Sequence, residues 1–329
     1  MRRVLVTGGC GFIGCNFLRQ VIFEQPETEW VNLDSLTYAG RTENTEDFAD
    51  VESYRFVRGG IEDWALVDDL LSEGEGFDAV VNFAAESHVD RSIVGPRVFV
   101  ETNVLGTQNL LEAARRHGVG RFIQVSTDEV YGSLEPDDPP FTEQSSLAPN
   151  SPYAASKASA DLLCRAYYET YGMPVIVTRC SNNYGPYQFP EKLIPSFIHN
   201  AMHDRPVPLY GDGLNVRDWL HVEDHCRAVA VVLDKGDAGE VYNIGGGNES
   251  TNLEITRLIL KELGKGEDLI SYVTDRPGHD RRYAIDSSYL QRTLGWRPAH
   301  TFETGIRQTI EWYKNNTDWA FKVTAGIAD

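Results

Sequence analysis

The sequence feature that most constrains the fold is a glycine-rich turn near the N-terminus. Arg3–Thr7 has the character of a buried strand, and Gly8, Gly11 and Gly14 follow it in a GxxGxxG spacing. A helical pattern over Ile13–Gln25 comes next. In such a unit the first glycine permits the tight turn, the second lets the backbone approach a pyrophosphate, and the third lets the helix pack closely on the strand. The unit predicts a dinucleotide-binding fold.

A carboxylate occupies the expected end of the second strand. Asp34 lies 20 residues after Gly14, at the position where an acidic side chain accepts hydrogen bonds from the adenosine ribose. A carboxylate there would also repel a 2′-phosphate. The spacing therefore predicts NAD, and not NADP, as the cofactor.

Short hydrophobic runs alternate with helical patterns through the first half of the chain. Strands are expected over Arg3–Thr7, Val31–Asp34, Tyr54–Arg58, Ala79–Phe83, Phe122–Ser126 and Val175–Thr178. Helices are expected over Ile13–Gln25, Val98–His117 and Tyr153–Tyr171. This order predicts an α/β fold with a Rossmann-type, doubly wound parallel sheet, because right-handed helical crossovers between parallel strands cover both faces of the sheet.

The pattern changes after about Cys180, where a loop is expected over Asn182–Gln188. Beyond it, strands are expected over Val207–Tyr210 and Val241–Ile244, and helices near Leu193–His203, Glu223–Leu233 and Asn252–Leu263. We predict a dinucleotide-binding domain over residues 1–180 and a smaller C-terminal substrate-binding lobe over 181–329, with some segments interleaved. Lys322–Asp329 is expected to be a frayed tail.

Composition excludes several classes of protein. The net charge of −19 is unfavourable for binding nucleic acid or an anionic membrane, which both attract basic surfaces. No run approaches the roughly 18 apolar residues of a membrane span, and no leader-like apolar region precedes the first strand. The five cysteines lack a CxxC spacing, which favours free thiols in a reducing compartment. We expect a cytoplasmic protein that acts on a small molecule.

The eight histidines give no metal-binding pattern. His199 and His203 are four residues apart on an expected helix, but no carboxylate accompanies them in the sequence. A solvated helix face is the better interpretation, so no metal is predicted.

Two patterns at the expected crevice point to chemistry. Tyr153 and Lys157 lie about one helical turn apart, so that the ammonium group can lower the pKa of the phenol. Thr127 follows a central strand, and Asp128 and Glu129 come next, in the crevice outside its carboxyl end. Two neighbouring carboxyl groups can divide acid and base work when their surroundings separate their pKa values. These five residues are the predicted catalytic group.

With these motifs the chain resembles the dTDP-glucose 4,6-dehydratases, a family of the extended short-chain dehydrogenase/reductase superfamily. The resemblance covers roughly residues 3–319. The matching segments are Thr7–Gly14, Leu33–Gly40, Ala84–Ser92, Ser126–Gly132, Pro152–Lys157, Arg179–Pro186, Arg217–Trp219 and Asp275–Asp280. The most specific match is the pair Asp128-Glu129 after Thr127, because relatives that only epimerise lack this pair.

The resemblance implies an NAD-dependent lyase of deoxysugar biosynthesis, which converts dTDP-glucose to dTDP-4-keto-6-deoxyglucose by oxidation, water elimination and re-reduction. Tyr153 would deprotonate the hydroxyl at carbon 4, and Thr127 would hydrogen-bond to it. Glu129 would remove the proton at carbon 5, and Asp128 would protonate the hydroxyl that leaves carbon 6. Lys157 would hold the nicotinamide ribose. A homodimer formed by the helices of residues 98–117 and 153–171 is also implied.

The resemblance further implies the contacts of both ligands. For the cofactor these are Gly8, Gly11, Phe12, Ile13, Gly14, Asp34, Ser35, Leu36, Thr37, Gly60, Ile61, Phe83, Ala84, Ala85, Glu86, Ser87, Thr102, Tyr153, Lys157 and Asn183. For the nucleotide sugar they are Ser87, Thr127, Asn182, Lys192, Leu193, Pro208, Leu209, Tyr210, Arg217, Asn252, Asp275, Arg276, Pro277, Gly278 and His279. Among these, Lys192, Arg217 and Arg276 would supply the positive charge that a diphosphate needs.

One position departs from the pattern of the family. The aspartate–isoleucine pair that follows the third strand in the family appears here as Gly60-Ile61. The adenine amino group thereby loses a carboxylate partner, unless Glu62 or Asp63 replaces it.

Three alternatives stay open. A nucleotide-sugar 4-epimerase would share the fold, although the Asp128-Glu129 pair argues against it. A UDP-glucose 4,6-dehydratase is also compatible, because uridine and thymidine differ by one methyl group, which contributes little to discrimination. A non-catalytic NAD-binding regulator would have no use for an intact set of Thr127, Tyr153 and Lys157.

Overall fold

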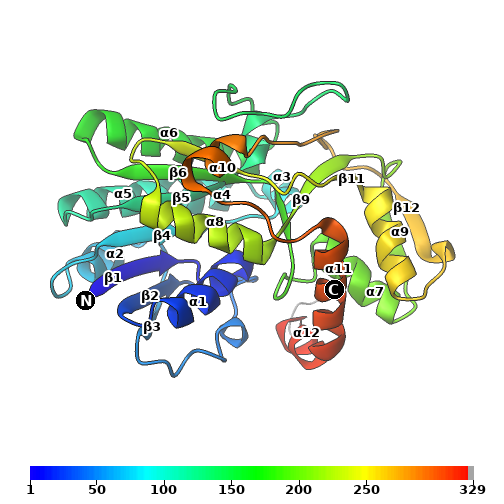
Figure 1. Cartoon of the computed structure of the whole chain (residues 1–329), viewed down its shortest axis with the longest axis horizontal. Helices are drawn as coiled ribbons and strands as arrows, with labels where there is room; N and C mark the ends of the chain where they lie inside the picture. Colours follow the sequence, from blue (N-terminus) through cyan, green and yellow to red (C-terminus); the bar gives the residue numbers. More distant parts are fainter. Residues whose placement is uncertain (325–329) are drawn as a thin grey trace.

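A seven-stranded parallel sheet forms the centre of the structure, a computed structural model that describes residues 1–324 (Figure 1). The strand order is β10-β6-β5-β4-β1-β2-β3. The strands are β1 (Arg2–Thr7), β2 (Thr28–Asp34), β3 (Tyr54–Arg58), β4 (Ala79–Asn82), β5 (Phe122–Thr127), β6 (Val175–Cys180) and β10 (Val241–Ile244). The order reverses between β1 and β4, so that a ligand crevice forms outside their carboxyl ends. This arrangement confirms the predicted doubly wound sheet.

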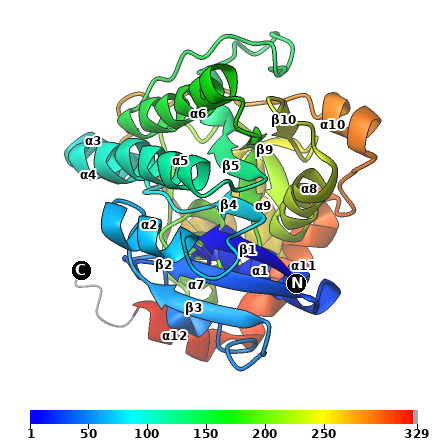
Figure 2. The same ribbon diagram turned by 90° about the vertical axis from the view of Figure 1, so that its left-hand side faces the viewer.

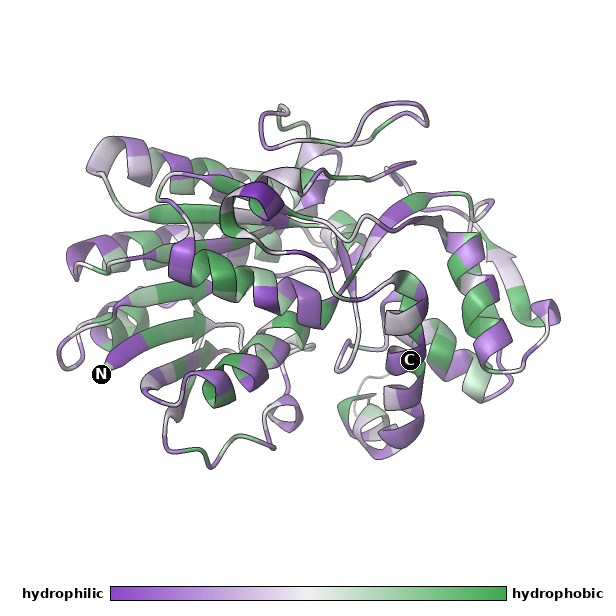
Figure 3. Ribbon diagram, in the orientation of Figure 1, coloured by the Kyte–Doolittle hydropathy of each residue, from purple (hydrophilic) through white to green (hydrophobic). Residues whose placement is uncertain are grey.

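Helices cover both faces of this sheet (Figure 2). On one face lie α2 (Trp64–Leu71), α5 (Thr107–Arg116) and α6 (Pro152–Tyr171), and on the other α1 (Phe12–Glu24), α8 (Val222–Lys235) and α10 (Ser288–Leu294). Each layer packs a hydrophobic stripe against the strands, which are themselves strongly hydrophobic because both of their faces are buried (Figure 3). Two hydrophobic cores result, one on each side of the sheet.

A smaller lobe with its own core lies beside the carboxyl ends of the strands (Figure 1). Its short sheets pair β7 (Asn182–Tyr184), β9 (Val216–His221) and β11 (Glu249–Thr251), and separately β8 (Val207–Tyr210) and β12 (Ile270–Val273). Its helices are α7 (Leu193–Met202), α9 (Asn252–Glu262), α11 (Phe302–Asn315) and α12 (Thr317–Thr324). The lobe also contains the short helix η4 (Glu267–Leu269), and short helices outside it are η1 (Thr42–Asn44), α3 (Val89–Val94) and η3 (Asp128–Tyr131).

The expected helix over Val98–His117 is not one regular helix. It consists of α4 (Arg97–Phe99), the π-helix η2 (Val100–Gly106) and α5. The wider turn of η2 places Asn103 against two other segments: Nδ2 of Asn103 donates to the Glu86 carbonyl (3.0 Å) and to Ser156 Oγ of α6 (2.8 Å). Hydrophobic periodicity does not distinguish such a turn from an α-helix, which is why the prediction missed it.

Three further expectations need correction. The strand Val241–Ile244, expected in the lobe, pairs with β6 and becomes an edge of the main sheet. The expected loop over Asn182–Gln188 contains β7, whose hydrogen bonds go to β9, a partner distant in sequence. The start of the expected frayed tail belongs to α12, where Val323 is fully buried, and residues 325–329 lie outside the described part of the chain. No helix within residues 1–324 is long and apolar enough to cross a membrane.

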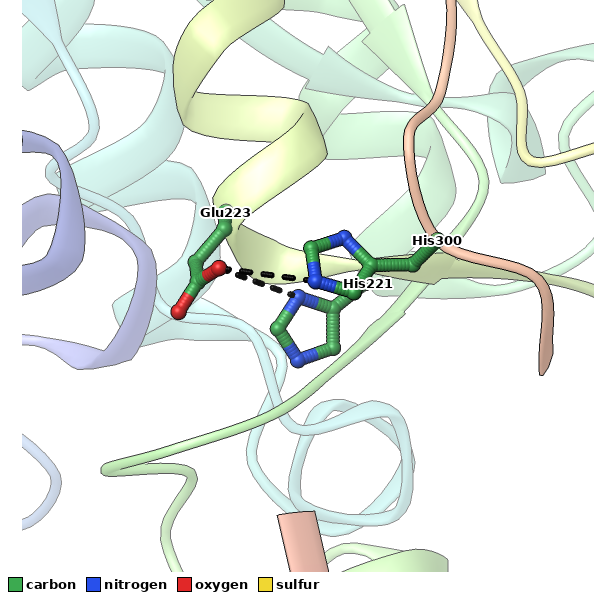
Figure 4. Close-up of side chains that lie close together, drawn as sticks. All are labelled: His221, Glu223 and His300. Carbon is green, nitrogen blue, oxygen red and sulfur yellow. Dashed lines mark ion pairs between the residues drawn. The ribbon is translucent and has the colours of Figure 1, made fainter. Parts of the chain in front are cut away.

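Two histidine rings contact each other where β9, α8 and the loop before α11 meet (Figure 4), with their planes tilted by 32°. The ring centroids of His221 and His300 lie 4.1 Å apart. A hydrogen bond from His300 Nδ1 to Asp224 Oδ2 (3.0 Å) raises the pKa of His300. The His221 side chain is fully buried, and neither ring nitrogen has a hydrogen-bond partner among the described residues. Burial lowers the pKa of His221 to about 3.

Replacing His221 by phenylalanine should reduce the sensitivity of the fold to acid. The unfolded chain binds a proton at His221 below about pH 6.5, whereas the folded chain does so only near pH 3. The free energy of unfolding therefore falls as the pH drops through this window, by about 1.4 kcal/mol per pH unit for this residue. Between pH 6.5 and pH 5, the free energy of unfolding of His221→Phe should fall by about 2 kcal/mol less than that of the wild type. Urea unfolding of both proteins at the two pH values measures the difference.

The neighbouring groups Glu223, Asp224 and His300 remain in this variant, so the comparison isolates His221. His203→Gln, at an exposed position, is the matched control. An unchanged pH slope in His221→Phe would contradict the assignment of a buried neutral imidazole.

Candidate active site

A cavity of about 390 Å³ lies at the carboxyl ends of the central strands. Every predicted cofactor contact except Leu36 lines it, together with Ser87, Thr127, Asn182 and Lys192 of the predicted substrate contacts. Leu36 has a left-handed backbone (φ 55°), and its amide donates to Asp34 Oδ1 (2.8 Å). It therefore fixes the Asp34 carboxylate at the cavity wall, although it does not line the cavity itself.

The glycine turn leaves no room for side chains. A Cβ atom on Gly8 would lie 2.6 Å from the Ala84 backbone nitrogen, and one on Gly14 would lie 2.3 Å from the Gly8 carbonyl oxygen. Helix α1 begins after Gly11 without a side-chain cap, so its first amide groups are free to bind an anion. Asp34 lies at the end of β2 and lines the same cavity. These features fit a dinucleotide, with its pyrophosphate at α1 and its adenosine ribose at Asp34.

Tyr153 and Lys157 project from the first turns of α6. Ser151 caps this helix by accepting a hydrogen bond from the Ala154 amide (3.0 Å), and Pro152 occupies its first position. Both side chains are buried at the cavity wall. Lys157 Nζ donates to the Val125 carbonyl of β5 (2.7 Å), which anchors the ammonium group behind the cavity.

The electrostatic effect on Tyr153 differs from the expectation. Burial, and next the Glu129 carboxylate, raise the pKa of Tyr153 well above its ordinary value, and hydrogen bonding to Thr127 opposes this only in part. Burial also lowers the pKa of Lys157. Lys157 alone therefore does not produce an acidic phenol in the absence of ligands. A bound cation beside Tyr153, such as an oxidised nicotinamide ring, would favour the phenolate.

Asp128 and Glu129 experience different surroundings. Burial and then the Glu129 charge raise the pKa of Asp128 well above its ordinary value. Burial also raises the pKa of Glu129, but Arg276, Arg217 and Lys192 oppose this. Asp128 Oδ2 is buried and has no hydrogen-bond partner within residues 1–324. The surroundings therefore favour protonation of Asp128 more strongly than that of Glu129, and the division of the pair into acid and base stays a prediction.

The three predicted phosphate-binding cations gather around Glu129. Lys192 Nζ donates to the Ser87 carbonyl (3.1 Å). Arg217 donates to the carbonyls of Val216 (2.7 Å) and Asp280 (2.9 Å) and lies over the Tyr283 ring. Arg276 forms an ion pair with Asp90 (3.0 Å). Three cationic groups therefore act on one carboxylate in a strongly acidic protein.

The remaining predicted substrate contacts lie in the lobe, outside the lining of the cavity. Tyr210 of β8 lies near His279, whose Nδ1 is 2.6 Å from Asp275 Oδ1. Leu209 is buried in the core of the lobe, which leaves the backbone of β8 for contact. The others are Leu193, Pro208, Asn252, Pro277 and Gly278, and their role stays a prediction.

Sequence reasoning missed several residues at the site. Ser126, Cys180 and Ser181 line the cavity at the ends of β5 and β6, and the rule that ligands bind at strand carboxyl ends would have found them. Behind Lys157, Arg179 donates to Asp161 (2.9 Å) and to Tyr131 Oη (2.9 Å) in a buried network. The sequence gives no signal for that network, because its members come from three separate elements.

Three residues that the sequence does not connect as metal ligands lie close together in the structure. Ligand atoms of His221, Glu223 and His300 lie within 4.8 Å of one another. Both nitrogens of His300 already have partners, Asp224 (3.0 Å) and Gln308 (3.2 Å). The rings of His199, on α7, and of His203, just after its end, are tilted by 43°, and His203 Nδ1 lies 2.7 Å from the His199 carbonyl. The absence of a metal stays a prediction.

Comparison with known proteins agrees with this geometry. Residues 5–309 match the family model described as GDP-mannose 4,6 dehydratase. The chain is 54% identical over 321 residues to a dTDP-glucose 4,6-dehydratase of Streptomyces niveus, covering 96% of this chain and 94% of the relative.

Two solved structures are similar over almost the whole chain. The dTDP-glucose 4,6-dehydratase DesIV of Streptomyces venezuelae, with NAD and TYD bound, has a TM-score of 0.94 at 52% identity, covering 98% of this chain and 99% of that chain. The enzyme of Bacillus anthracis in complex with NAD has a TM-score of 0.92 at 50% identity, covering 98% and 100%. The chain therefore belongs to the dTDP-glucose 4,6-dehydratase family of the extended short-chain dehydrogenases/reductases.

Proposed function

We propose that this protein converts dTDP-glucose to dTDP-4-keto-6-deoxyglucose with bound NAD, and that five buried or half-buried residues divide the chemistry. The observation that carries the proposal is the pair of carboxyl groups, Asp128 and Glu129, beside Tyr153 in one cavity. Oxidation at carbon 4 needs only a base for the hydroxyl proton. Elimination of water needs an additional base and an additional acid, and this pair supplies both.

The first step takes place at carbon 4. The phenolate of Tyr153 removes the hydroxyl proton, and Thr127 Oγ1 holds the same oxygen in place. Lys157, anchored on Val125, holds the nicotinamide ribose. NAD, when bound, supplies the hydride acceptor for this oxidation and the donor for the later reduction at carbon 6. Asp34 selects NAD because a 2′-phosphate would meet its carboxylate.

The elimination takes place at carbons 5 and 6. The ketone at carbon 4 makes the proton at carbon 5 acidic, and the Glu129 carboxylate removes it. Asp128, kept protonated by burial and by the charge of its neighbour, gives a proton to the hydroxyl that leaves carbon 6. Lys192, Arg217 and Arg276 bind the diphosphate and keep the unsaturated sugar in place between the steps.

The fate of substrate hydrogen tests the whole proposal. dTDP-glucose deuterated at carbon 4 should give a product with deuterium at carbon 6, because one cofactor carries the hydride away and returns it. A 4-epimerase would return the label to carbon 4. Mass spectrometry and NMR of the product distinguish the two, and a product without substrate deuterium at carbon 6 would rule out the dehydratase reaction. A parallel incubation with UDP-glucose measures whether the protein prefers thymine or uracil in the nucleotide of its substrate.

The two halves of the reaction should separate in variants. Asp128→Asn keeps the base for carbon 4 but lacks the acid for elimination, so the bound cofactor should accumulate in its reduced form after substrate is added. Tyr153→Phe should fail before this point, with turnover lowered about 10²- to 10⁴-fold. Absorbance in the reduced-nicotinamide band measures the difference. Equal absorbance changes in both variants would show that the roles are wrongly assigned.

The exposed hydrophobic residues on the α5–α6 side support a homodimer. Val94, Leu105 and Leu162 are 89%, 53% and 57% exposed, and they lie on α3, η2 and α6. These elements neighbour one another on one side of the molecule (Figure 2). Exposed apolar side chains on one side of a molecule are typical of an interface between subunits.

Lysine at both Leu105 and Leu162 should convert the dimer to a monomer, because the interface would have to bury two charges. Light scattering after gel filtration measures the mass. Leu214→Lys is the matched control, since Leu214 is 42% exposed in the lobe. A monomeric wild type would exclude the dimer, and a dimeric double variant would exclude this face.

The thiol chemistry supports action in the cytoplasm. All five cysteines are free and buried, as expected in a reducing compartment.

A further inference from the structure

The glutamate after Gly60-Ile61 has a carboxylate group with no assigned role. Residues 59–62 connect β3 to α2, and Gly60, Ile61 and Glu62 line the cavity together with Val98 and Thr102. The Glu62 carboxylate has no hydrogen bond or ion pair within the described part of the chain, whereas the backbone here is firmly held. Asn109 Nδ2 donates to the Glu62 carbonyl (2.9 Å).

The position of this carboxylate depends on Gly60. A Cβ atom built on Gly60 would lie 2.1 Å from Glu62 Oε1 and 2.4 Å from Oε2. The carboxylate therefore occupies the space that a side chain at residue 60 would fill. The neighbouring Asp63 is not available for the same purpose, because its carboxylate caps α2 by accepting a hydrogen bond from the Leu66 amide (3.1 Å).

The expected positions of the parts of the cofactor along the cavity indicate which part Glu62 faces. The pyrophosphate belongs at the first turn of α1, and the adenosine ribose at Asp34 on β2. The adenine base then extends past β2 to the end of β3, where residues 59–62 lie. The edge of adenine carries an amino group, which donates hydrogen bonds, and an ionised carboxylate only accepts them.

We propose that Glu62 accepts a hydrogen bond from the 6-amino group of adenine, and that the missing side chain at Gly60 makes room for it. The proposal rests on the NAD site proposed above and adds a determinant of base selectivity to it. A purine with oxygen at carbon 6 would present an acceptor to the carboxylate and would be repelled.

Binding of two dinucleotides to protein freed of nucleotide tests the proposal. Isothermal titration calorimetry should show that wild type binds NAD about 10-fold more tightly than nicotinamide hypoxanthine dinucleotide, which carries oxygen at carbon 6. Glu62→Gln should bring this ratio close to one, because an amide can donate to the oxygen. Asp63→Asn removes a charge from the adjacent residue and should keep the wild-type ratio, because asparagine still accepts the hydrogen bond that caps α2.

Failure of this proposal is distinguishable from failure of the NAD site. If wild type binds neither dinucleotide, the cofactor site itself is wrong. If wild type binds NAD and Glu62→Gln keeps the full ratio, only the role of Glu62 is wrong.

The role of Gly60 has its own test. Glu62→Ala should lower the ratio of the two affinities because it removes the carboxylate. Gly60→Ala should lower the ratio as well, because the new methyl group displaces the Glu62 carboxylate. Gly60→Asp combined with Glu62→Ala should restore the ratio, because the new carboxylate enters the same space. If Gly60→Ala keeps the wild-type ratio of the two affinities, Gly60 does not make room for the Glu62 carboxylate.

Discussion

The contact between Gly8 and Ala84 leaves no space for a side chain, and the rest of the site depends on it. With a Cβ atom only 2.6 Å from the Ala84 nitrogen, any other residue at position 8 would push β1 away from the end of β4. This contact lies at the point where the strand order reverses, so the turn that begins α1 and the loop that follows β4 share one crevice. The free amide groups of α1 and the segment from Phe83 to Ser87 therefore line the same cavity.

A second constraint is electrostatic. The chain carries a net charge of −19, yet its site needs positive charge for a diphosphate. Lys192 and Arg217 donate to backbone carbonyls and not to carboxylates, although the charge of Glu129 acts on both. Burial lowers the pKa of both groups, because removing a charge from water costs free energy. An anionic ligand would offset this cost, which is a physical reason why the free energy of diphosphate binding can be large here.

The parts that the sequence predicted well are those in which local pattern and function agree. Strand β3 has the expected bounds. The glycine turn, Asp34, Thr127 and Tyr153 line one cavity, because each lies at the carboxyl end of an expected strand or at the start of an expected helix. The parts that it missed depend on distant partners. Strand β10 joins the main sheet only because β6 offers an edge, and η2 depends on Asn103 meeting Glu86 and Ser156. No local pattern contains such information. The pair His221 and His300, 79 positions apart, is missed for the same reason.

The lobe also contributes to the surroundings of Asp128 and Glu129, because its strand β9 carries two charged residues that act on them. Successive side chains of a strand point to opposite sides, and β9 presents Arg217 and Asp218 next to each other. Burial raises the pKa of both acids; Asp218 adds to the rise at Asp128, whereas Arg217 opposes the rise at Asp128 and at Glu129. The Asp218 carboxylate accepts hydrogen bonds from the Gly246 and Asn248 amides, which hold it in place. The difference between the surroundings of Asp128 and Glu129 is therefore set in part by Asp218, on a strand that the second half of the chain supplies.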